Sequence, residues 1–137
     1  MPAAYAHYRF AKKAASVLPE EVRKFPDLYY AGCHGPDPLF YYSPFFHHPV
    51  EALADWCHNT AGSVLLSAAA SRIGGAESGR AYLFGLLTHY CLDSICHPYV
   101  NALAQAGACN HTELETEFDR FLLARDGEAQ PHKRNLG

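Results

Sequence analysis

Residues 89–97 read His89-Tyr-Cys-Leu-Asp93-Ser-Ile-Cys-His97, which places two histidines and an aspartate at successive steps of four. On a helix, residues four apart lie on one face, one turn from each other. The neighbouring positions are mostly apolar, so the helix should be largely buried, where an isolated charge is unfavourable unless it is paired or bound to a metal. Imidazole and carboxylate are side chains that hold zinc. The stretch therefore predicts a buried helix that carries metal ligands.

The pattern on both sides of this stretch is helical throughout. We expect the motif to lie on a helix over residues 77–103, which Pro98 kinks or ends. Proline with acidic residues in a first turn, and Asn110 as an N-cap, mark the starts of other helices. The expected helices are 3–17, one beginning at 19, 26–31, 50–71 and 111–124. No strand-like alternation appears, so the predicted class is an all-α helical bundle.

The composition limits both the architecture and the partners. The chain has 137 residues, of which 49% are hydrophobic, and this fits one domain with a core of its own. We expect a helical domain over residues 1–126 and a polar tail over 127–137. A formal charge of −3 offers no basic field for nucleic acid, so no stable nucleic-acid complex is expected.

The cysteines and the first residues indicate a cytoplasmic location. Five cysteines are an odd number and include no Cys-x-x-Cys pair, which favours reduced thiols over a disulfide framework. The start of the chain lacks the apolar segment of a signal peptide, and no apolar stretch is long enough to span a bilayer.

Further candidate ligands lie outside the 89–97 stretch. His111 and Glu115 repeat the four-residue step, His58 lies within another expected helix, and Asp37 stands between two prolines. Asp93 is central and its two oxygens can bridge two ions. His47 and His48 are alternatives to His58 as a ligand. A buried network of His–Asp hydrogen bonds without any ion is the alternative to a metal site.

Residues 32–49 are rich in proline and aromatic side chains and should form an ordered, irregular loop. Its aromatic run, Phe40-Tyr-Tyr42 with Phe45-Phe46, has two interpretations. One is a wedge that enters a lipid interface, and the other is a plug packed over the helices that shapes a pocket.

Four segments in this order resemble the zinc-dependent phospholipase C family, and more closely its bacterial phospholipase C/D domain proteins. The resemblance covers about residues 2–125. The segments are Ala3-Ala-Tyr-Ala-His-Tyr-Arg-Phe10, Gly35-Pro-Asp-Pro-Leu-Phe-Tyr-Tyr42, His89-Tyr-x-x-Asp93-x-x-x-His97-Pro98 and His111-x-x-x-Glu115. That family is all-helical and uses a cluster of three zinc ions to hydrolyse phosphodiesters.

The resemblance implies a ligand set for two to three zinc ions in this chain. Asp37 would also act as the general base on the attacking water. One zinc would be held by Asp37, His58 and His89, with Asp93 bridging to a second; another would be held by His97, His111 and Glu115; and His7 would join Asp93 at the third.

The chain departs from the family's pattern in three respects. Secreted members complete the third site with an N-terminal Trp, whereas the only Trp here is Trp56, so we hypothesise that removal of Met1 frees the Pro2 amine for that role. The spacing from Asp93 to His97 is shorter than in the secreted enzymes. Family members usually continue well past this length, so we expect a fragment or a minimal version.

The resemblance and the candidate ligands together predict a metal-dependent phosphodiester hydrolase of phospholipase C type. The substrate would be a phospholipid or another phosphodiester, with transient contact to a membrane surface. No serine has the elbow or histidine pairing of a protein nucleophile, so zinc-activated water is the expected nucleophile. The alternatives are a nuclease-like zinc phosphodiesterase and a non-catalytic metal-binding helical domain.

Overall fold

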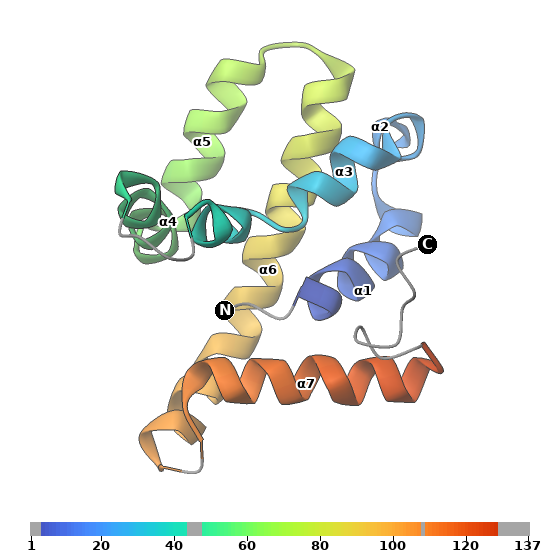
Figure 1. Cartoon of the computed structure of the whole chain (residues 1–137). Coiled ribbons are helices and arrows are strands. Elements are labelled where there is room, and N and C mark those ends of the chain that lie inside the picture. The colour runs from blue at the N-terminus through green and yellow to red at the C-terminus, as the bar shows by residue number, and fades with distance from the viewer. Residues whose placement is uncertain (1–3, 44–47, 108, 129–137) are drawn as a thin grey trace.

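The computed structural model describes residues 4–43, 48–107 and 109–128, and all its regular elements are helical (Figure 1). No strand occurs in these ranges, which confirms the predicted all-α class. In chain order the elements are α1 (Ala4–Ala14), the 3-10 turn η1 (Ala15–Val17), α2 (Glu20–Lys24), α3 (Pro26–Gly32), the 3-10 turn η2 (Asp37–Tyr41), α4 (Pro49–Asn59), α5 (Gly62–Ile73), α6 (Glu77–Gln105) and α7 (His111–Asp126). None of these helices is long and apolar enough to cross a membrane.

The long helix α6 is the axis of the fold. α1, α2, α3, α5 and α7 all contact it. In Figure 1, α5 runs beside the first half of α6, α3 crosses α6 within that same half, and α7 lies across its second half. The predicted motif at residues 89–97 therefore lies where helices from both ends of the chain converge.

Two glycines allow α3 and α6 to touch through their backbones. A Cβ atom on Gly85 would lie 2.1 Å from the Tyr29 carbonyl oxygen, and one on Gly32 would lie 2.3 Å from the Tyr82 carbonyl oxygen. Beside this crossing, Tyr29 and Cys33 are fully buried, and the Tyr29 hydroxyl donates a hydrogen bond of 2.7 Å to the Ala11 carbonyl. The crossing fixes the end of α3, and thus the loop that follows it, against α6.

The single helix expected over residues 50–71 is wrong. The chain forms α4 and α5 instead, separated by extended backbone at Thr60 and Ala61 (ψ 142° and 127°). Apolar periodicity continues across the break, so only tertiary contacts reveal it: α4 packs on η2, while α5 packs on α6. The break leaves His58 in the last turn of α4, next to η2.

For α6 and α7, the structure agrees better with the helices expected from the sequence. α6 continues through Pro98 to Gln105. Asn110 caps α7 as predicted, because its side chain accepts from the Glu113 amide at 2.9 Å and the Glu113 carboxylate accepts from the Asn110 amide at 3.0 Å. This reciprocal cap sets the start of α7, where His111 lies.

Candidate metal centre

The eight predicted ligands come from five elements and meet in three groups along α6. α1 supplies His7, η2 supplies Asp37, α4 supplies His58, α6 supplies His89, Asp93 and His97, and α7 supplies His111 and Glu115. In each group the potential ligand atoms lie within 4.8 Å of one another. The first group is Asp37, His58 and His89; the second is His7, His89 and Asp93; and the third is His97, His111 and Glu115.

The first group lies where η2 and α4 meet α6. Asp37 is buried, and its Oδ1 lies 2.8 Å from His58 Nε2 and 3.7 Å from His89 Nε2. The loop before it is held close to α6, because Gly35, at φ +54°, packs its backbone on the His89 ring. A side chain on Gly35 would collide with that ring, so this glycine is required both by its conformation and by the close contact.

The second group brings α1 onto α6. The rings of His7 and His89 stack with centroids 4.3 Å apart, and both side chains are buried. His7 Nε2 lies 3.2 Å from Asp93 Oδ1, and His89 Nε2 lies 3.2 Å from Asp93 Oδ2. Asp93 therefore faces an imidazole with each of its oxygens.

The third group joins α6 to α7. Glu115 Oε1 lies 3.4 Å from His97 Nε2 and 3.0 Å from His111 Nε2. His97 Nε2 also lies 3.6 Å from Asp93 Oδ1, so Asp93 links this group to the second one. The three groups thus form one continuous cluster of imidazoles and carboxylates.

The imidazoles are oriented by hydrogen bonds on the side away from the cluster. His58 Nδ1 donates to the Ala54 carbonyl at 2.8 Å, His89 Nδ1 to the Cys33 carbonyl at 3.2 Å, and His111 Nδ1 to Asn101 Oδ1 at 3.0 Å. Because these oxygens only accept, Nδ1 carries a proton, and Nε2, the nitrogen that faces the cluster, is the one that a metal can bind once it is deprotonated. Metal-binding histidines are oriented in this way.

Three buried atoms of the cluster lack a hydrogen-bond partner in the described part of the chain: His7 Nδ1, Asp37 Oδ2 and His89 Nε2. The last two belong to the same group. An unpartnered buried polar atom is unfavourable by about 1–3 kcal/mol. A divalent cation between nitrogen and oxygen ligands would satisfy Asp37 Oδ2 and His89 Nε2 together, whereas a network of His–Asp hydrogen bonds leaves Asp37 Oδ2 unsatisfied. The donor set therefore fits zinc.

The charges of the cluster are strongly coupled. Burial raises the pKa of the Asp93 carboxyl, but the imidazoles of His7 and His89 lower it by a larger amount. The pKa of Asp93 therefore lies well below its usual range. The hydrogen bond with Asp37 raises the pKa of His58, and the one with Glu115 raises the pKa of His97. These raised pKa values favour protonation of the two rings when no metal is bound, and a proton on Nε2 occupies the position that a metal would need.

We expect the stabilisation by zinc to increase with pH. A histidine whose pKa is raised above 6.5 stabilises the metal-free fold below that pH and loses this effect as pH rises through the raised pKa. Zinc binds only the deprotonated ring, so the stabilisation that zinc gives to the fold increases as pH rises. The shift in melting temperature on adding zinc, measured from about pH 5 to about pH 8, should grow with pH. A shift that is constant over this range would contradict competition between protons and metal at these rings.

Of the two alternatives to His58, the structure describes only His48, which lies outside the three ligand groups. His48 accepts a hydrogen bond from the Val50 amide at 3.2 Å and caps α4. His47, Pro2 and the phenylalanines 45 and 46 lie outside the described residues. Phe40 packs on the His58 ring with centroids 5.1 Å apart, as the plug interpretation expects. Tyr41 and Tyr42, in contrast, are exposed, at 49% and 65%.

Sequence reasoning missed two residues that support the cluster. Asn101 orients His111, and Asp119 accepts hydrogen bonds from the first turn of α1, which carries His7. Both continue the steps of four already noted: 89, 93, 97 and 101 on α6, and 111, 115 and 119 on α7. Extending each series of four-residue steps by one further turn would have identified both residues.

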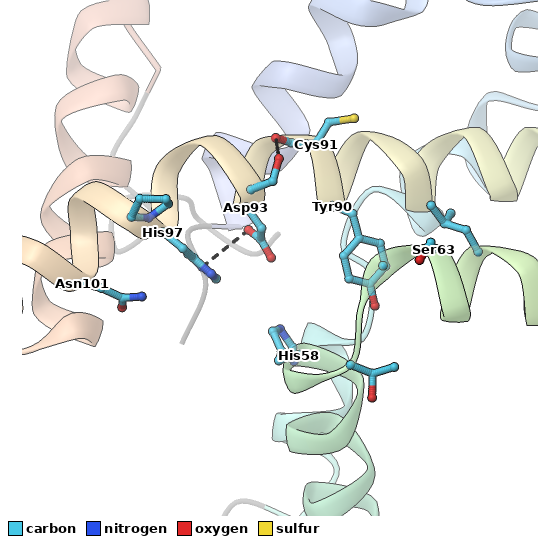
Figure 2. Close-up of a pocket in the computed structure, with 12 residues that line it drawn as sticks. His58, Ser63, Tyr90, Cys91, Asp93, His97 and Asn101 are labelled. Carbon is cyan, nitrogen blue, oxygen red and sulfur yellow. Dashed lines mark hydrogen bonds and ion pairs between the residues drawn. The ribbon is translucent and has the colours of Figure 1, made fainter.

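A groove of about 550 Å³ opens beside the cluster, between α5 and α6. Figure 2 shows Asp93 and His97 on α6 and His58 on α4 directed toward the same space, with Tyr90 and Ser63 alongside. The remaining lining combines polar side chains such as Thr60, Ser94 and Asn101 with apolar ones such as Leu66 and Pro98, and it contains no lysine or arginine. The cluster thus has an entrance that an extended ligand can occupy.

Comparisons with known proteins agree with this geometry. The family model for zinc-dependent phospholipase C matches residues 6–136, which is nearly the whole chain. Neither the curated proteins nor the solved structures gave a significant match. On the strength of the family match, the chain belongs to the zinc-dependent phospholipase C family.

Proposed function

We propose that this protein hydrolyses phosphodiesters as a phospholipase C, with two to three zinc ions held by the eight clustered ligands. The main support is the meeting of three ligand groups along α6, with imidazole Nε2 atoms facing shared carboxylates. Such clusters are the usual sites at which divalent ions a few ångströms apart act together on a phosphate.

In the proposal, Asp37, His58 and His89 would hold one ion, His97, His111 and Glu115 would hold another, and His7 with Asp93 would hold a third, with Asp93 shared between neighbouring ions. When bound, zinc supplies positive charge to the phosphate oxygens and lowers the pKa of a coordinated water. Asp37 has two carboxylate oxygens: Oδ1 faces His58 and His89, and Oδ2 lacks a partner among the described residues. The oxygen that does not bind the metal would take the proton from the attacking water, so we assign Asp37 the role of general base.

The groove supports a substrate whose negative charge is concentrated in the diester. Its lining has hydroxyl and amide groups from Thr60, Ser63, Ser94 and Asn101 but no lysine or arginine. The metal ions would therefore have to neutralise the phosphate, and the rest of the substrate would contact uncharged groups.

A phospholipid substrate also requires contact with a lipid surface. Tyr41 ends η2 and Tyr42 follows it, while Leu53 and Trp56 lie on α4, which packs on η2; all four are exposed. Tyrosine and tryptophan favour the interface between lipid and water. We therefore include transient contact of this edge with a membrane surface in the proposal.

The test is hydrolysis by the zinc-loaded protein, with and without EDTA. We expect turnover of a chromogenic phosphodiester and release of phosphorylated head group from phosphatidylcholine vesicles, lost on chelation and restored by zinc. Single-stranded DNA serves as the third substrate and identifies a nuclease-like activity. A protein that carries two or three zinc ions and hydrolyses none of these substrates would support the non-catalytic metal-binding alternative.

A further inference from the structure

We infer that Asp119 is a positioning residue for the metal centre, which acts by fixing the first turn of α1 and, through it, His7. This inference rests on the proposed zinc site at His7 and Asp93. Asp119 itself lies outside all three groups of candidate ligands, so its effect on the metal is indirect.

The contacts of Asp119 tie α7 to the start of α1. Its Oδ2 accepts from the Tyr5 amide and its Oδ1 from the Ala6 amide, each at 2.8 Å. The first amides of a helix have no partner within the helix, and a carboxylate at this end also interacts favourably with the helix dipole. Both hydrogen bonds are partly buried, so little competition from water is expected.

These two hydrogen bonds set the position of His7. His7 follows Ala6 directly, and its ring stacks on His89 and faces Asp93. Glu115, a candidate ligand of the third group, lies one turn before Asp119 on α7. α7 therefore contributes a ligand to one group and, through Asp119, fixes the helix that contributes a ligand to another.

The same pair of helices offers a matched control. Asp126 also joins α7 to α1, because it accepts from the Tyr5 hydroxyl at 3.0 Å and from Arg9 Nη2 at 2.9 Å. These contacts are exposed and do not involve the amides beside His7. Loss of Asp126 should loosen the same interface without releasing the first turn.

The test compares zinc binding by Asp119→Ala, Asp126→Ala and the wild type, measured by competition with a chromophoric chelator and by metal analysis. Partners that orient ligands typically change metal affinity about 10- to 100-fold. We expect Asp119→Ala to weaken the binding of one zinc ion by about that factor and to leave the other ions bound. Asp126→Ala should bind zinc as the wild type does, although both variants lower the melting temperature.

Two further variants separate positioning from general destabilisation. Adding Asp119→Ala to His7→Ala should cause no further loss of zinc, because Asp119 acts only through His7. Asp119→Asn keeps one acceptor oxygen and should give an intermediate loss, which carries the test if Asp119→Ala does not fold. Unchanged zinc affinity in a folded Asp119 variant, or an equal loss in Asp126→Ala, would overturn this inference alone. A wild type that binds no zinc would overturn it together with the proposed function.

Discussion

Asp93→Asn is expected to remove at least one zinc ion and to lower phosphodiester hydrolysis by about a thousand-fold or more. Asp93 faces three imidazoles: His7 and His89 at 3.2 Å and His97 at 3.6 Å. Asparagine has nearly the same shape, but it has no charge and replaces one oxygen with an amide nitrogen that only donates. The loss of several kcal/mol of charge stabilisation corresponds to about this change in rate. Metal analysis and kcat/KM on the chromogenic diester measure the two effects.

The control for this variant is Asp55→Asn. Asp55 is an exposed aspartate on α4 outside the three ligand groups, so the same chemical change there should leave zinc content and turnover unaltered. If folded Asp93→Asn retained all its zinc and full activity, Asp93 would not be the bridging ligand. The proposal would then have to place the ions around Asp37 and Glu115 alone.

The ligands on α6 and α7 could be predicted because helical periodicity alone brings them together. Steps of four place His89, Asp93 and His97 on one face, as they do His111 and Glu115, whatever the rest of the chain does. The same rule would also have predicted Asn101 and Asp119. For these segments, the local pattern contains most of the information about the site.

The positions of Asp37 and His58 could not be obtained in that way. His58 reaches Asp37 because the backbone breaks at Thr60 and Ala61, which directs α4 to η2 instead of along α6. Apolar periodicity continued through the break and predicted one helix. The pairing depends on tertiary contacts, and only the resemblance to a family indicated it beforehand.

His7 is the clearest case of a role that local sequence hides. Beside Tyr8 and near two lysines, its pattern is typical of a surface histidine. The structure buries it to 4% exposure by stacking it on His89. That burial depends on α1 being held between α6 and α7, which are far away in sequence.

Gly85→Ala is expected to destabilise the fold by about 1–3 kcal/mol and to weaken zinc binding at the same time. The added methyl group would lie 2.1 Å from the Tyr29 carbonyl oxygen and 2.9 Å from the Cys33 amide nitrogen, so α3 must move away from α6. The Cys33 carbonyl accepts from His89 Nδ1, and the chain continues from there through Gly35 to Asp37. Movement of α3 should therefore disturb both the orientation of His89 and the position of Asp37. Denaturant unfolding of the metal-free protein and zinc titration of the folded protein measure the two effects.

Gly75→Ala provides the control, because a Cβ atom there meets nothing within 4 Å. It should be close to neutral in both measurements. Inside a helix, alanine is intrinsically favoured over glycine by about 1 kcal/mol, so any destabilisation by Gly85→Ala must come from the α3–α6 contact and not from helix propensity. If Gly85→Ala proved as stable as the wild type, the two helices would not be packed backbone to backbone. If it were less stable but bound zinc equally well, the site would not depend on α3, and the link from this crossing to His89 and Asp37 would be broken.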